Sequence, residues 1–196
     1  MLAAERDETK RAAFWEQVAA VASERLVVVD ETSINIAMAR RYARAPRGQR
    51  AYGRVPRNHG SNLSVIGAVG LRGVVASLSV AGAVDTIAFD VFVHRVLLPA
   101  LQPGDVVLLD NLKVHPASQI ETAVRQAQGA VLFLPPYSPD FSPIEQCWSK
   151  LKTFLRGAKA RTTRRLQRAL RAGLQTITPQ DLQGWFRHCG YEVTTN

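Results

Sequence analysis

Three short segments of the chain are almost entirely apolar, and their order limits the folds that the chain can adopt. They span residues 26–30, 106–110 and 130–134, and apolar residues at helical spacing lie between the second and the third. Segments that are apolar throughout are typical of strands buried on both faces. A strand, a helix and another strand over about 30 residues form a right-handed parallel crossover. The pattern therefore predicts an α/β fold in which these strands lie in the middle of a sheet covered by helices.

The remaining segments predict an antiparallel hairpin and helices at both ends of the chain. Strands at residues 63–69 and 74–80 flank the turn Gly70–Gly73, and a helix with an apolar face that includes Ile87 begins at Asp85 or Thr86. Residues 1–24 read as a short linker helix ahead of a domain at residues 25–196. The last third is expected to be a helical extension, with helices that start at Pro143, Thr163 and Thr178. Between the first strand and the hairpin, repeated Pro and Gly residues predict a basic loop with one short strand.

Composition narrows the function classes. The chain has 196 residues, of which 25 are basic and 16 acidic, so its formal net charge is +9, and 46% of its residues are hydrophobic. This length and hydrophobic content suit one sizeable core and exclude a disordered tail. No apolar run reaches the roughly 18 residues of a membrane span, the N-terminus is too charged for a signal peptide, and two cysteines cannot form a disulfide scaffold. We expect a cytoplasmic protein with a polyanionic partner, nucleic acid first and a membrane surface second.

Three carboxylates are candidates for the chemistry. Asp30 and Asp110 each end an apolar strand, and Glu145 follows in the segment 134–145. Ligands of open α/β sheets lie beyond the carboxyl ends of the strands, and hard oxygen donors suit Mg²⁺ or Mn²⁺. Simpler interpretations exist, because an Asp after a strand often caps a turn. Ser142 and Glu145 also fit the capping box of a helix.

Basic side chains accompany these acids. On a helix that starts at Pro143, Glu145, Lys152 and Arg156 fall within about 40° of one another, which would place two cations beside a phosphate chain. Eight arginines and no acid lie between residues 34 and 73, and further arginines follow on the helix that starts at Thr163. The alternative for each is a solvated surface residue. The candidate DNA contacts are Lys152, Arg156, Arg44, Arg47, Arg164 and Arg168.

The sequence resembles the catalytic domain of the mariner superfamily of transposases, in its bacterial insertion-sequence branch. Four motifs carry the resemblance, which extends over roughly residues 25–190: VVDET at 28–32, YARAPRG at 42–48, LDNLKVH at 109–115 and LPPYSPDFSPIE at 134–145. The resemblance implies an RNase H-like mixed sheet flanked by helices. It also implies a triad of Asp30, Asp110 and Glu145 that holds two Mg²⁺ or Mn²⁺ ions, with Asn111 and His115 beside the ligands.

The function that the resemblance implies is cut-and-paste transposition. Its partners would be double-stranded DNA, namely transposon ends and target DNA at TA sites, and a second copy of the chain in a homodimer. A membrane or a small-molecule substrate is not expected, and the location would be the bacterial nucleoid. The sequence departs from the family pattern at Ser142, where Asn is usual, and at Ala43, where Gly is frequent. It also lacks room before Asp30 for the family's helix-turn-helix DNA-binding region.

Three other interpretations remain open. Strand-end acids that bind Mg²⁺ also occur in phosphoacceptor receiver domains, although the 79 residues between Asp30 and Asp110 and the net charge of +9 disfavour one. A different RNase H-like nuclease is disfavoured by the segment 134–145. A transposase remnant that only binds DNA retains all three acids and is not distinguished by the sequence.

Overall fold

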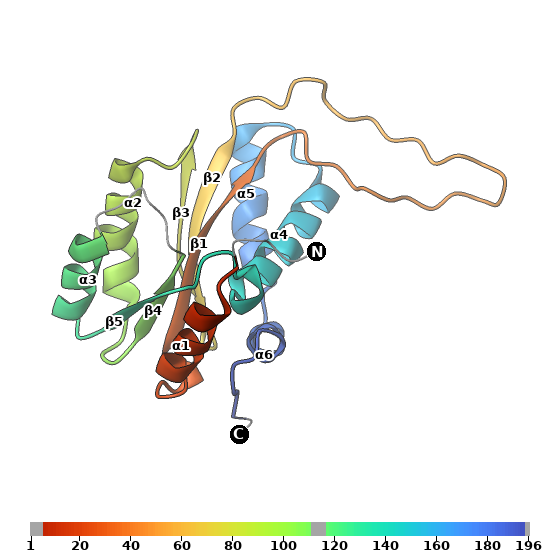
Figure 1. Cartoon of the computed structure of the whole chain (residues 1–196). Helices are drawn as coiled ribbons and strands as arrows, with labels where there is room; N and C mark the ends of the chain where they lie inside the picture. Colours follow the sequence, from red (N-terminus) through yellow and green to blue (C-terminus); the bar gives the residue numbers. More distant parts are fainter. Residues whose placement is uncertain (1–5, 111–116, 195–196) are drawn as a thin grey trace.

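The computed structural model describes residues 6–110 and 117–194, in which a five-stranded mixed sheet separates two layers of helices (Figure 1). The strand order is β3-β2-β1-β4-β5. β2 pairs antiparallel with β1 and β3, whereas β4 pairs parallel with β1 and β5, which confirms both the hairpin and the crossover. The strands are β1 Leu26–Ile34, β2 Leu63–Gly70, β3 Gly73–Ala81, β4 Val106–Leu109 and β5 Ala130–Phe133.

Each face of the sheet has its own apolar core. Successive residues of β1 alternate between the two cores, so that Leu26 and Val28 face one and Val27 and Val29 face the other. The first core is closed by α1 Glu8–Val18, α4 Ile144–Ala158, α5 Thr163–Leu174 and α6 Pro179–His188. The second core is closed by α2 Thr86–Phe92 and α3 Ala117–Gln126. Burial on both faces explains why residues 26–29 of β1 and the whole of β4 are apolar.

Two local expectations about the sheet and α2 need correction. β5 is as apolar as β4 but forms an edge of the sheet, where Ala130 is exposed and the other residues are only partly buried, because no described strand pairs with its other side. Ile87 is 74% exposed, because α2 turns Phe89 and Phe92 toward the sheet instead. α2 then continues as a π-helical turn over Val93–Leu97 and a 3-10 turn over Leu98–Ala100.

The N-terminal helix packs into the first core. Asp7 caps α1 by accepting hydrogen bonds from the backbone of Thr9 and Lys10. Phe14 and Val18 are buried, and the Phe14 ring stacks on Phe141 with 5.6 Å between ring centres. A linker would leave such side chains in water, so the boundary expected at residue 25 does not follow the packing.

The segment between β1 and β2 leaves the body of the protein as a long loop (Figure 1). Residues 35–62 contain no strand, so the short strand expected here is absent. Repeated Pro and Gly residues and the lack of an apolar face explain why the segment remains irregular. Its start is held to the body because the Arg161 guanidinium donates to the carbonyl oxygens of Ile36 and Met38, at 2.7 and 2.9 Å.

Both cysteines, Cys147 and Cys189, are buried and unpaired. In the described ranges, none of the helices has the length and apolar character needed to span a bilayer.

Candidate active site

The register of the parallel ladder brings two acids to the same end of neighbouring strands. β1 and β4 pair from Leu26 with Val106 through Val29 with Leu109, and Asp30 and Asp110 are the next residues of each chain segment. Asp30 does not end its strand as expected, because β1 runs on to Ile34 along β2. β4 stops at Leu109 and leaves that side of Asp30 open. An open position beside a continuing strand makes Asp30 accessible while its backbone stays fixed.

Glu145 reaches the same place from the first turn of α4. A 3-10 turn over Pro139–Phe141 precedes the helix, and the backbone N–H of Glu145 donates to the carbonyl oxygen of Ser142 at 3.1 Å. The capping box considered from the sequence is not formed, because Pro143 occupies the N-cap position and no side chain caps the helix. Glu145 is exposed, so its carboxylate is available for another role.

Asp30, Asp110 and Glu145 line one pocket of about 500 Å³. Residues 134–139 together with Ser142 form a wall of this pocket. The sequence therefore identified three acids, separated by up to 115 positions, that the fold brings to one pocket. Asn111 and His115, which were expected beside them, lie outside the described residues.

The pocket disfavours negative charge on Asp30. Burial, supplemented by the nearby carboxylates of Glu145 and Asp110, raises the pKa of Asp30 from 3.8 to about 6. The backbone N–H of Glu31 and the indole N–H of Trp148 oppose this change, because they stabilise the ionised form. Burial is the largest contribution to the raised pKa. Ionisation of Asp30 in the metal-free site therefore costs free energy, and a bound cation would offset that cost.

Trp148 is a part of the site that the sequence did not reveal. Trp148 is buried in the first core, and its Nε1–H donates to Asp30 Oδ2 at 2.8 Å. The indole crosses β2 at Gly67, the residue that pairs with Asp30 across the ladder. A Cβ at Gly67 would lie 2.5 Å from the Trp148 ring, so a side chain there would displace the indole. Gly67 opposite a candidate acid was the one available signal, because strand glycines often mark a close approach.

The donor set fits a hard divalent cation. Three carboxylates face the pocket, and oxygen ligands without histidine or cysteine suit Mg²⁺ or Mn²⁺. Within residues 6–110 and 117–194, no three acidic, histidine or cysteine side chains lie close enough together to hold a metal ion between them. Mg²⁺ usually keeps several water ligands and binds through one or two carboxylates together with phosphate oxygens, so it does not require a complete set of protein ligands.

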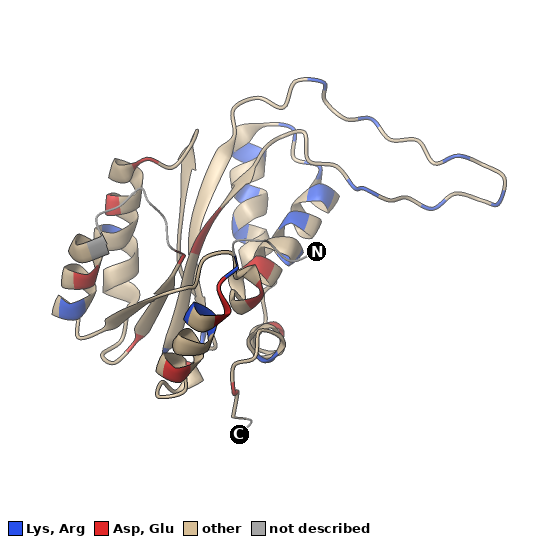
Figure 2. Cartoon of the chain, in the orientation of Figure 1, with Lys and Arg blue, Asp and Glu red and all other residues tan. Residues whose placement is uncertain are grey.

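The candidate DNA contacts divide into two groups. Basic residues are spaced along the 35–62 loop and along α4 and α5, and no acidic residue interrupts the loop (Figure 2). Arg44 and Arg47 on the loop and Arg164 and Arg168 on α5 are exposed, whereas Lys152 and Arg156 on α4 are partly buried.

Arg156 lies in a separate basic groove of about 700 Å³ next to α4. Arg40, Arg41 and Tyr42 from the start of the loop form its other side. Burial and the charge of Arg41 lower the pKa of Arg156. Guanidinium groups crowded in this way favour an anionic ligand.

Solved structures with a similar fold are transposase domains. "Mos1 transposase paired-end complex with left transposon end" matches with a TM-score of 0.71 at 18% identity, over 93% of this chain and 56% of that one. "Crystal structure of the Mos1 mariner paired end complex with Mn" matches with a TM-score of 0.68 at 19% identity, over 93% of this chain and 56% of that one. "Structure of Mos1 transposase catalytic domain and Raltegravir with Mg" matches with a TM-score of 0.65 at 15% identity, over 93% of this chain and 85% of that one. The likeness confirms the RNase H-like fold, and the chain spans about half the length of the first two.

No curated protein sequence matches significantly. The DDE superfamily endonuclease family, however, matches residues 25–167, a range that includes β1 to β5, α4 and all three acids of the pocket. Since this range covers most of the chain, the protein belongs to the DDE superfamily endonucleases.

Proposed function

We propose that this chain is the catalytic part of a transposase that cleaves DNA and joins the released end to a target. The observation that carries the proposal is the pocket shared by Asp30, Asp110 and Glu145 within the fold of a DDE endonuclease. These residues would hold two Mg²⁺ or Mn²⁺ ions. Such ions supply Lewis-acid activation of the attacking water or 3′-hydroxyl and stabilisation of the departing oxygen.

The side chains of the protein would bind and orient the DNA. Lys152 lies seven residues beyond Glu145, almost two helical turns, and so about 10 Å further along α4. That distance suits a phosphate one or two nucleotides from the cut. Arg156, with the groove beside it, and the exposed arginines of the loop and α5 would hold flanking duplex, mainly through phosphates. The proposed loop and α5 contacts are Arg44, Arg47, Arg164 and Arg168.

The finer biological role follows from the same proposal. The DNA would be transposon ends and a target at TA dinucleotides. The active assembly would be a homodimer, and the protein would be located at a bacterial nucleoid. Solved relatives that contain a transposon end, Mn or Mg support the DNA and metal parts of the proposal. A receiver domain is contradicted by the fold, because β2 and β3 run antiparallel to their neighbours where a doubly wound receiver has a parallel sheet.

Metal-dependent nicking of supercoiled plasmid by the purified chain tests the proposal. With Mn²⁺ or Mg²⁺ we expect nicking that is lost in Asp30→Asn, Asp110→Asn and Glu145→Gln variants, all of which should remain folded. A matched variant, Glu16→Gln on the exposed side of α1, should retain the wild-type rate. Duplex binding without any nicking would instead favour a remnant that only binds DNA.

A further inference from the structure

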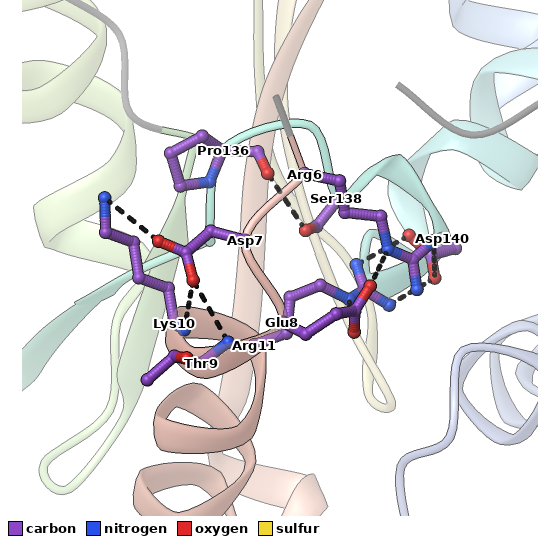
Figure 3. A network of polar contacts seen from close by, with 9 residues as sticks. All are labelled: Arg6, Asp7, Glu8, Thr9, Lys10, Arg11, Pro136, Ser138 and Asp140. Carbon is purple, nitrogen blue, oxygen red and sulfur yellow. Dashed lines mark hydrogen bonds and ion pairs between the residues drawn. The ribbon is translucent and has the colours of Figure 1, made fainter. Parts of the chain in front are cut away.

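Asp140 belongs to the segment that forms the wall of the acidic pocket, but its side chain does not line that pocket. It pairs instead with Arg11 of α1, 129 positions earlier in the sequence (Figure 3). The Arg11 guanidinium donates from Nη1 to Oδ1 at 3.1 Å and from Nη2 to Oδ2 at 2.6 Å. A bidentate pair of this kind fixes orientation as well as distance.

The surroundings of Arg11 keep this pair in one geometry. Arg11 is 5% exposed, and its guanidinium carbon lies 3.7 Å from the centre of the Phe141 ring. The Phe141 ring is held in turn by Phe14, which stacks on it. The carbonyl oxygen of Phe141 accepts a hydrogen bond from the Tyr191 hydroxyl at 2.6 Å. A buried guanidinium requires an anion, and the Arg11 hydrogen bonds lower the pKa of Asp140, so the carboxylate stays ionised.

A short series of turns connects Asp140 to Glu145. The N–H of Phe141 donates to Ser138, that of Ser142 to Pro139 and that of Glu145 to Ser142, each through the backbone at 3.0 to 3.1 Å. Ser138 also donates its hydroxyl to the carbonyl oxygen of Pro136 at 3.2 Å (Figure 3). Each hydrogen-bonded turn shares residues with the next, so a displacement of Asp140 would move both the wall of the pocket and Glu145.

We propose that Arg11 is a positioning residue for metal-dependent DNA cleavage, which acts through Asp140 to hold the wall of the pocket and the first turn of α4 in place. The inference rests on the proposed function, and it extends the functional unit to α1, ahead of residue 25 where the family match begins. Neither Arg11 nor Asp140 touches DNA or metal in this role.

Three variants and one control test the proposal in the full chain. Arg11→Met keeps a long apolar side chain over Phe141 but removes the ion pair, Asp140→Asn removes the charge of its partner, and the third variant combines them. Lys10→Met, at the adjacent and exposed position, makes the same change of charge without touching Asp140. Nicking is measured below the melting temperature of every variant, and Mn²⁺ affinity is measured by calorimetry without DNA.

For each single variant we expect kcat to fall by about tenfold or more, because precise placement of reacting groups is worth at least this much. The KM for DNA should change little, and the Kd for Mn²⁺ should rise several-fold. The double variant should be no worse than either single variant, since the two residues act as one unit. Wild-type kcat and Mn²⁺ affinity in folded Arg11→Met, or losses that add in the double variant, would overturn the proposal.

The two readouts separate this inference from the proposed function. If the wild-type chain does not nick DNA, the proposed function fails, while a weaker Mn²⁺ affinity in Arg11→Met but not in Lys10→Met still supports the positioning role. A wild-type chain that binds no Mn²⁺ overturns both. Should Arg11→Met not fold, Arg11→Lys keeps the charge but not the bidentate geometry, and it should show the same loss in kcat and Mn²⁺ affinity.

Discussion

Replacement of Asp30 by Asn should stabilise the metal-free protein at neutral pH. The folded pocket raises the pKa of Asp30 from 3.8 to about 6, chiefly through burial. The folded state therefore retains a proton on Asp30 that the unfolded state has already released between these two pH values. Folding stability must fall as the pH rises through this window, and the loss is complete once both states are ionised. Asn carries no charge and avoids this loss, while its amide oxygen can still accept from Trp148.

The size of the effect follows from the same pKa difference. At 1.36 kcal/mol for each pH unit, a change from 3.8 to about 6 corresponds to about 3 kcal/mol. Urea denaturation without metal should show Asp30→Asn more stable than wild type by up to about 3 kcal/mol at pH 7.5, with the difference approaching zero near pH 4. The exposed Glu16→Gln serves as the control for a generic loss of negative charge.

Mn²⁺ should reverse the order of stability. A ligand that binds only the folded state stabilises it in proportion to the logarithm of its concentration, so wild type should gain stability and Asp30→Asn should gain much less. A pH-independent difference between the two proteins, or an equal response of both to Mn²⁺, would refute the view that Asp30 is a partly buried carboxylate whose charge a bound cation offsets.

Other measurements follow from the same structure. Glu145→Gln should abolish metal-dependent nicking without the loss of about 0.5–2 kcal/mol that removal of a helix cap causes, and a destabilised but active variant would contradict this. Lys152→Ala should slow nicking by about tenfold, whereas Arg125→Ala on the exposed side of α3 should not; equal losses would indicate only a general effect of charge. Gly67→Ala should destabilise the protein by about 1–3 kcal/mol in urea denaturation, because its Cβ would lie 2.5 Å from the Trp148 ring, and a neutral effect would contradict that contact. Affinity for duplex DNA should fall with salt at a log–log slope of about −0.9 per phosphate neutralised, and a salt-independent affinity would exclude phosphate contacts.

Most of the fold could be predicted because its signals are local. The apolar run of β1, the Gly70–Gly73 turn and the capping residues Asp85 and Thr178 each act within a few positions of themselves. Where the sequence misled, as at the edge strand β5, the local pattern was correct but its place in the sheet depended on which strand was its neighbour.

The candidate acids were predicted for a similar reason. Asp30 and Asp110 each follow an apolar run, and ligands of open α/β sheets lie beyond the carboxyl ends of such strands. That β1 and β4 are neighbours in the sheet was decided by the fold. Glu145 depended on the resemblance of its segment to a known motif, since spacing alone left a helix cap as an equal interpretation. The fold then placed its carboxylate at the pocket and left the helix uncapped.

The sequence by itself determined the strands, the helices, the charge and the candidate acids. Hydrophobic periodicity and capping depend only on residues that are close together in the chain. Only the tertiary structure decided what supports those acids. Trp148 reaches Asp30 across 118 positions and Arg11 reaches Asp140 across 129, and nothing in the local pattern of either residue distinguishes it from an ordinary core or surface side chain. Such contacts depend on how helices dock on the sheet, and that is settled by the packing of the whole core.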